Sequence, residues 1–256
     1  MIPRVLIVAG SDSGGGAGIQ ADVKTVTMLG GHAMTAVTAL TAQNTLGVQG
    51  VLPVPAGFVV EQMRSVIDDI GVDAVKIGMI GSAETARAVA GELEGLGVPI
   101  VFDPVMVATS GSALADAETI EAFERLMRVA TVTTPNLPEL EALGGEAAVL
   151  RCGCHLLVKG GHAGGPRVVD RLISPTGQEI AGLEGKRFDT DDTHGTGCTL
   201  ASALATGLAA GLSVGKAFEQ AVRFVRIAIV AAPGLGGGHG PIGHALGVNP
   251  FAELEG

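Results

Sequence analysis

The chain has 256 residues, of which 47% are hydrophobic and 3% aromatic, with no tryptophan or tyrosine. Sixteen Lys and Arg stand against 26 Asp and Glu, so the formal net charge is −10. Nucleic-acid modules need a basic face and aromatic rings for stacking, and disordered chains lack this apolar content, so both classes are excluded. The 40 glycines are about twice the usual share, without a collagen repeat, and need an explanation.

The sequence shows no pattern of a membrane span, a secretion signal or a disulfide framework. No apolar run reaches the roughly 18 residues of a membrane span, and the first residues lack the pattern of a secretion signal. The three cysteines are too few and odd in number for a disulfide framework. Cys152 and Cys154 form a C-x-C pair beside His155, but no second ligand pair has zinc-like spacing. We therefore expect a cytoplasmic protein without a membrane partner or a structural metal.

Short runs rich in Val and Ile alternate with amphipathic stretches over the first 160 residues. Strands are predicted at 5–9, 33–40, 74–77, 100–102, 131–133 and 156–158, and helices at 19–29, 57–70, 83–96 and 117–129. The strands lack strict polar–apolar alternation, which indicates a mostly parallel sheet covered by helices on both faces.

The remaining third of the chain has a different pattern. Turn-separated runs at 168–173, 177–180 and 186–188 predict hairpins at the sheet edge, and two Ala-rich helices are expected at 199–210 and 214–231. The glycine-rich tail from Pro233 is expected to loop across the domain. No linker or internal repeat is visible, so residues 1–256 are predicted to form one domain.

Glycines concentrate where predicted strands end or helices begin, at residues 10–18, 159–162, 194–198 and 236–240. Ligands of such sheets bind beyond the carboxyl ends of the strands, where glycine lets backbone N–H groups approach an anion. The first cluster is neither a dinucleotide fingerprint nor a P-loop, because Ile19 and Gln20 stand where a third glycine or Lys-Ser/Thr is required. It is either a ligand loop or a tight turn.

Residues 192–198, Asp-Thr-His-Gly-Thr-Gly-Cys, lead into a predicted helix. The first N–H groups and the helix dipole converge there, which suits charge developing on a transferring phosphoryl group. Cys198 would stand in the first turn, where we expect a lowered thiol pKa and an available thiolate. The alternative is an N-cap at Thr193 or Thr196, with Cys198 as a small buried side chain.

Acidic and amide side chains follow two neighbouring strands. Asp103 ends the strand at 100–102, and Asn136 and Glu139 follow the strand at 131–133. Their oxygens suit Mg²⁺, which keeps much of its hydration shell. Asn136 and Glu139 could instead cap a helix. Lys159, at another strand end, could neutralise phosphate, although a lone lysine there is more often on the surface.

These motifs together resemble the hydroxymethylpyrimidine/phosphomethylpyrimidine kinases of thiamine biosynthesis, within the ribokinase-like superfamily. The matching segments are 10–22 (GSDSGGGAGIQAD), 38–47 (TALTAQNTLG), 76–80 (KIGMI), 103–111 (DPVMVATSG), 134–139, 158–162, 192–200 and 238–244 (GHGPIGH). The resemblance thus covers nearly the whole chain. It implies a three-layer α/β/α sandwich with a mostly parallel central sheet and a short edge hairpin region.

The resemblance also implies a reaction: ATP and Mg²⁺ are used to phosphorylate 4-amino-5-hydroxymethyl-2-methylpyrimidine and then its monophosphate. A homodimer is favoured. The site residues implied are a pyrimidine group, Gly10, Asp12, Ala17, Gln43, Met79 and Val105; a nucleotide and phosphate group, Asp103, Asn136, Lys159 and Thr193; Asp103 and Glu139 for Mg²⁺, partly through water; and the anion hole Gly195, Thr196 and Gly197 with Cys198 as base.

Two segments depart from the family pattern. The stretch between Glu139 and Leu156 is short, so a helix there is expected to be trimmed or missing, and Asp191-Asp192 replaces basic residues of some relatives. Two rival functions stay open at this point. One is a pyridoxal kinase, which shares the implied fold, and the other is a sensor that binds the pyrimidine without phosphorylating it.

Overall fold

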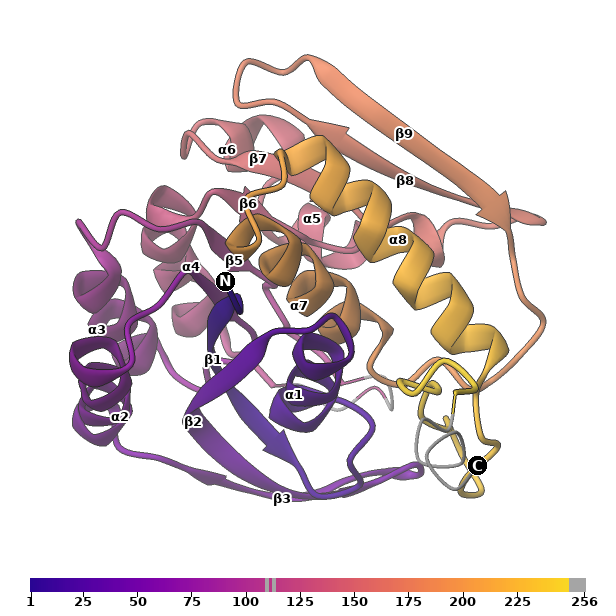
Figure 1. The fold of residues 1–256 in the computed structure, drawn as a ribbon, viewed down its shortest axis with the longest axis horizontal. Coiled ribbons are helices and arrows are strands. Elements are labelled where there is room, and N and C mark those ends of the chain that lie inside the picture. The colour runs from indigo at the N-terminus through magenta and orange to yellow at the C-terminus, as the bar shows by residue number, and fades with distance from the viewer. Residues whose placement is uncertain (109–110, 112–113, 249–256) are drawn as a thin grey trace.

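The computed structural model describes residues 1–108, 111 and 114–248. Its described strands form one nine-stranded sheet in the order β3-β2-β1-β4-β5-β6-β7-β8-β9 (Figure 1). The strands are β1 (Arg4–Asp12), β2 (His32–Asn44), β3 (Gly47–Pro53), β4 (Ala74–Ile77), β5 (Ile100–Phe102), β6 (Val132–Thr133), β7 (His155–Val158), β8 (Arg167–Ile173) and β9 (Glu179–Lys186).

Neighbours from β2 through β7 pair in parallel, whereas β3 at one edge and β8 and β9 at the other are antiparallel. The central strands are buried on both faces, which explains their continuous apolar sequences. The predicted parallel sheet and edge hairpin are therefore confirmed.

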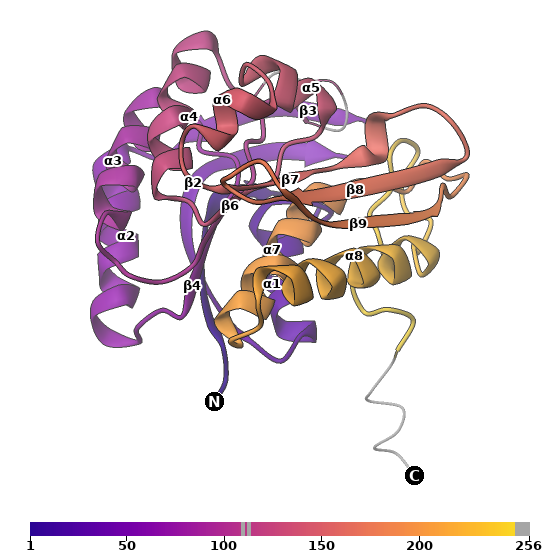
Figure 2. The ribbon, with the colours of Figure 1, turned by 90° about the horizontal axis from the view of Figure 1, so that it is seen from above.

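Helices cover both faces of the sheet and form the two outer layers (Figure 2). One face carries α2 (Ala56–Asp69), α3 (Ala83–Leu93), α4 (Ala117–Val129), α5 (Leu137–Ala142) and α6 (Glu146–Leu150), and the other carries α1 (Gly18–Met28), α7 (Thr196–Ala209) and α8 (Val214–Val230). Each layer has its own apolar core against the sheet. This arrangement is the expected three-layer α/β/α sandwich.

The structure differs from the prediction in three regions. Strand β3 was not predicted, because its sequence GVQGVLP contains two glycines and a proline, residues that a strand tolerates mainly at a sheet edge. The runs predicted at 177–180 and 186–188 are replaced by the single strand β9. The short stretch before Leu156 holds two short helices, α5, which begins at Leu137, and α6. Two residues of the resembling segment 103–111, at positions 109 and 110, lie outside the described residues.

Helix ends follow local capping chemistry. Ser82 and Asp116 cap α3 and α4, each accepting a hydrogen bond from a backbone N–H three residues later. Within the part of the chain that the structure describes, no helix combines the length and apolar character needed to cross a bilayer.

Candidate active site

A cavity of about 940 Å³ opens at the carboxyl ends of the parallel strands. All of the site residues implied by the sequence line it, although they come from seven separate segments of the chain. They are Gly10, Asp12, Ala17, Gln43, Met79, Asp103, Val105, Asn136, Glu139, Lys159, Thr193, Gly195, Thr196, Gly197 and Cys198. Parallel strands end at one edge of the sheet, so strand-end residues distant in sequence meet there.

The loop between β1 and α1 is organised around the carboxylate of Asp12. This buried group accepts hydrogen bonds from the backbone N–H groups of Gly14 at 2.8 Å, Gly16 at 3.0 Å and Ala17 at 2.8 Å. Burial acts to raise the pKa of Asp12, but hydrogen bonds from His194 and these N–H groups outweigh it and lower the pKa. The loop therefore carries its own anion, and these three N–H groups already have an acceptor.

Gly18 shows why the loop needs glycine. Its φ is +56°, and a Cβ there would overlap the carbonyl oxygen of Gly10. The close approach lets α1 begin directly over the end of β1. Part of the glycine excess thus builds the loop itself.

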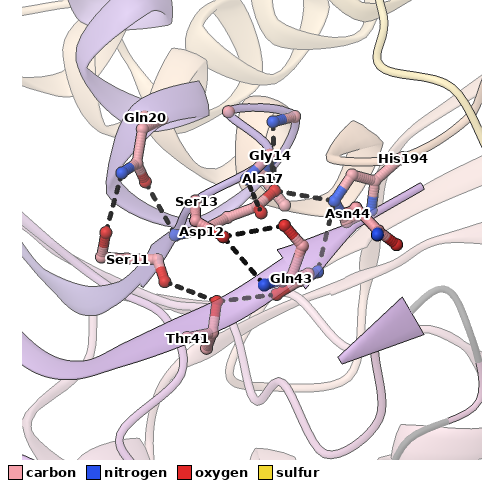
Figure 3. Close-up of polar contacts among 12 residues, drawn as sticks. Ser11, Asp12, Ser13, Gly14, Ala17, Gln20, Thr41, Gln43, Asn44 and His194 are labelled. Atoms are coloured by element: carbon pink, nitrogen blue, oxygen red, sulfur yellow. Dashed lines mark hydrogen bonds and ion pairs between the residues drawn. The ribbon is translucent and has the colours of Figure 1, made fainter. Parts of the chain in front are cut away.

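The ring-binding end implied by the resemblance lies beside this loop. The Gln43 amide lies near Thr41 and His194 (Figure 3), and the Met79 side chain packs against the bare Cα of Gly10. A planar amide with one donor end and one acceptor end faces a cavity with apolar walls.

At the other end of the cavity, Lys159 joins two carboxylates. Its Nζ donates to Asp103 Oδ1 at 2.6 Å and lies 3.7 Å from Glu139 Oε2. Burial acts to lower the pKa of Lys159, but the two carboxylates outweigh it and raise the pKa, so Lys159 is an ammonium. The surface-lysine alternative is wrong, because this side chain is only 13% exposed.

Asn136 and Glu139 form a capping box at the start of α5. The Asn136 side chain accepts from the Glu139 N–H at 2.9 Å, and the Glu139 carboxylate accepts from the Asn136 N–H at 2.8 Å. The capping alternative is thus confirmed, and both residues also line the cavity. Burial raises the pKa of Glu139.

The donor set for Mg²⁺ is small. Among the described residues, no group of three or more His, Cys, Asp or Glu side chains is placed to hold a metal ion. Two carboxylates with an ammonium between them fit an ion that takes most of its ligands from water and phosphate. Within the same described part of the chain, the C-x-C pair at Cys152 and Cys154 belongs to no such group.

Helix α7 starts within the glycine cluster at residues 194–198. Its N-cap is Gly195 at φ +87°, with no side-chain cap, so the alternative of a cap at Thr193 or Thr196 is wrong. A Cβ on Gly195 would overlap the carbonyl oxygen of Gly16, so the two loops lie in direct backbone contact here. The first turn of α7, Thr196 to Cys198, lines the cavity, and the described residues supply no side-chain cap to its N–H groups.

The predicted thiolate at Cys198 is wrong. Cys198 does lie in the first turn of α7 and is partly exposed to the cavity. However, its surroundings raise its pKa to about 11 through burial, with Asp22 and Asp103 adding to the shift and Lys76 opposing it. Desolvation therefore outweighs the helix dipole, and the group is a neutral thiol near pH 7.

Beneath Cys198 lies an ion pair that the sequence reasoning missed. Lys76 Nζ donates to both Asp22 oxygens at 2.9 and 2.8 Å, and the Ser202 hydroxyl donates to Asp22 at 2.6 Å. Both charged side chains are fully buried. Burial acts to lower the pKa of Lys76, but Asp22 prevails and raises it. A lone lysine inside the apolar strand A-V-K-I was the available sequence signal.

His194 was the second residue missed. Its Nε2 lies 2.8 Å from Asp12 Oδ2, and its backbone N–H donates to the Gly240 carbonyl at 3.1 Å. It joins the first loop, the start of α7 and the glycine-rich tail. The tail is therefore held against the residues just before α7.

The chain matches the family model described as phosphomethylpyrimidine kinase over residues 12–243. It belongs to this family. It is 51% identical to the hydroxymethylpyrimidine/phosphomethylpyrimidine kinase of Streptomyces coelicolor, covering 96% of each chain.

Two further similar proteins are a longer sequence relative and a solved structure. The chain is 46% identical to the thiamine biosynthesis multifunctional protein ThiED of Corynebacterium efficiens over 94% of its length, but spans only 35% of that longer protein. The structure of Staphylococcus aureus pyridoxal kinase in complex with AMP-PCP and pyridoxal aligns with a TM-score of 0.86 at 31% identity, covering 96% of this chain and 94% of that one. The fold of this phosphomethylpyrimidine kinase family member is ribokinase-like, as the sequence implied.

Proposed function

We propose that the chain transfers a phosphoryl group from ATP to the hydroxymethyl group of 4-amino-5-hydroxymethyl-2-methylpyrimidine, and a second one to the resulting monophosphate. The observation that carries this proposal is a single cavity lined at one end by the Gln43 amide and at the other by Lys159, with the start of α7 between them. The kinase family to which the chain belongs supports the same reaction.

In this proposal the ring lies against Met79 and Val105, and the Gln43 amide pairs with its aminopyrimidine edge. An amide offers one donor and one acceptor in a plane, which matches an amino group beside a ring nitrogen. The loop at Gly10, Asp12 and Ala17 forms the adjoining wall.

The phosphate chain of ATP would lie between Lys159 and the first turn of α7, beside Asn136 and Thr193. Lys159 supplies positive charge, and the N–H groups of α7 accept the charge that builds on the transferring group. Mg²⁺ near Asp103 and Glu139, partly through water, would neutralise further phosphate charge.

Cys198 is assigned the proton of the attacking hydroxyl. In a loose phosphoryl transfer this proton leaves late, so a base that is rarely ionised can still serve. A pKa of about 11 makes the thiolate scarce but strongly basic, so turnover should rise with pH.

The discriminating experiment offers the purified protein the pyrimidine, its monophosphate and pyridoxal, each with ATP and Mg²⁺, and resolves the products by chromatography. We expect both mono- and diphosphate from the pyrimidine. Faster turnover of pyridoxal would favour the activity of the structurally similar pyridoxal kinase, and binding without product would favour a sensor. Sequence identity of 51% to the pyrimidine kinase, against 31% to the pyridoxal kinase, supports the first outcome.

We also propose a cytoplasmic homodimer. Exposed apolar side chains gather on the antiparallel edge formed by β2 and β3, where Leu40 is 48%, Leu46 70% and Leu52 64% exposed. Such an edge is suited to pairing with a second copy. Sedimentation velocity of the wild type and of Leu52→Lys measures this directly.

A further inference from the structure

His194 lies where three segments meet beside the ring-binding end of the cavity. Its Nε2 lies 2.8 Å from Asp12 Oδ2 and 3.4 Å from Nε2 of Gln43 (Figure 3). The residue is 7% exposed. No step of the proposed phosphoryl transfer uses it, yet it contacts the side chain proposed to recognise the ring.

The contact with Asp12 determines where the imidazole carries its proton. An ionised carboxylate only accepts hydrogen bonds, and the lowered pKa of Asp12 keeps it ionised. His194 Nε2 must therefore carry a hydrogen and donate it to Asp12. A protonated Nε2 cannot accept a second hydrogen from the Gln43 amide, so it favours the amide oxygen as its neighbour.

Thr41 leads to the same result from the other side. Its hydroxyl lies 2.9 Å from the Ser11 carbonyl oxygen and 3.1 Å from Gln43 Oε1. A hydroxyl has one hydrogen, and when it is donated to Ser11 the Thr41 oxygen presents only lone pairs to the amide. Thr41 then favours the amide NH₂ group as its neighbour.

Both neighbours therefore favour one orientation of the amide, with its oxygen toward His194 and its NH₂ toward Thr41. A half-turn about the last side-chain bond relates it to the orientation drawn in Figure 3. The two orientations have the same shape and differ only in which end donates and which accepts. Hydrogen bonding alone selects between them.

We propose that His194, held by Asp12, is a positioning residue that sets the orientation of the Gln43 amide and thereby the hydrogen-bond pattern that the pocket accepts. The inference rests on the proposed function, in which Gln43 contacts the pyrimidine. A 4-aminopyrimidine presents an NH₂ donor beside a ring-nitrogen acceptor, whereas its 4-oxo counterpart presents an acceptor beside an N–H donor. With the hydroxymethyl group held at the phosphoryl-transfer end, one amide orientation fits the first ring and the half-turned amide fits the second.

The test compares kcat/KM for 4-amino-5-hydroxymethyl-2-methylpyrimidine with that for its 4-oxo analogue. In the wild type we expect a preference of roughly 10²-fold for the amino compound, since two hydrogen bonds are mismatched in the other. His194→Phe keeps a ring of similar shape but loses the donor, and its preference should fall below about 10-fold. His194→Gln restores an N–H donor and should recover much of the preference.

Ser13→Ala is the matched control. The Ser13 hydroxyl donates to the Gln43 carbonyl and accepts from the Gln43 N–H, both at 2.8 Å, so this variant perturbs the backbone of Gln43 but not its amide. Its KM for the pyrimidine should rise while the preference stays at the wild-type value. Thr41→Val removes the other neighbour of the amide and should lower the preference as His194→Phe does.

An unchanged preference in folded His194→Phe, or in Thr41→Val where the first variant does not fold, overturns the inference. Thermal melting and the KM for ATP identify variants that are folded. Gln43→Ala distinguishes a wrong positioning role for His194 from a wrong proposed function. If Gln43→Ala leaves the KM for the pyrimidine unchanged, the proposed site is wrong, whereas a raised KM together with unchanged preference in the other variants overturns only the positioning role.

Discussion

Alkylation of Cys198 should be slow at neutral pH and should accelerate steeply as the pH rises. Its surroundings raise the thiol pKa to about 11, with burial as the main cause. At pH 7 the thiolate fraction is then about 10⁻⁴, and at pH 9 about 10⁻², because each unit below the pKa lowers it tenfold. Since only the thiolate attacks iodoacetamide, the rate should rise about 100-fold between these pH values.

The measurement follows carbamidomethylation by peptide mass spectrometry, which reads Cys198 separately from Cys152 and Cys154. A Cys152→Ser/Cys154→Ser protein is the control. Neither cysteine lines the cavity, and neither do the residues to which they are hydrogen-bonded. A Cys198 rate that levels off below pH 9 would show that the helix dipole outweighs desolvation, and the reasoning would fail.

The role of the Cys198 thiol in turnover can be tested by substitution. Cys198→Ala should lower kcat by roughly 10²-fold with little change in the KM for the pyrimidine, as for loss of a general base. In the wild type, log kcat should rise with pH over the range in which thiol reactivity rises. Wild-type turnover by the alanine variant would remove Cys198 from the mechanism.

Two further predictions concern stability. Lys76→Met leaves the fully buried Asp22 carboxylate without its ion-pair partner and should lower the free energy of unfolding in urea by about 3–5 kcal/mol. Lys76→Met combined with Asp22→Asn should recover most of that loss. Equal stability of the single and double variants would contradict this. Burial lowers the pKa of His244 from 6.5 to about 4, and its Nε2 lies 2.9 Å from the Thr199 hydroxyl. Between those pH values the unfolded chain binds a proton that the folded chain excludes, so stability should fall by about 3 kcal/mol as the pH drops from 6.5 to 4, and His244→Gln should remove that part of the pH dependence.

The sequence predicted those parts of the fold in which the burial of a strand or helix is evident from its own run of residues. The strands at 74–77 and 100–102 were predicted with the observed bounds because they are buried on both faces and therefore continuously apolar. The edge strand β3 was not, since its residues are mostly exposed and its glycines and proline indicate a turn. For the short helix α5 the sequence offered a cap at Asn136 and Glu139 but no bounds, and Pro138 stands near its start, where proline is tolerated.

At the site, the sequence indicated positions but not protonation states. Strand ends and glycine clusters, together with the family resemblance, predicted residues that do line one cavity. The charge of Cys198 was mispredicted because it depends on burial and on Lys76 and Asp22, which lie far away in the sequence. His194 was overlooked for a similar reason, because its partner Asp12 stands 182 residues earlier.

The two glycine loops are in direct contact, and this bears on how the proposed reaction is positioned. The Gly16 carbonyl occupies the space that a side chain on Gly195 would take, and Asp12 binds both the first loop and His194. The wall proposed for the pyrimidine and the N–H groups proposed for the phosphoryl group are therefore fixed relative to each other by direct contact. Alignment of hydroxyl and phosphoryl group is then built into the fold, and much of the entropic cost of bringing reactants together is met before either binds. Gly195 permits this contact because it has no side chain, and contacts of this kind account for part of the glycine content.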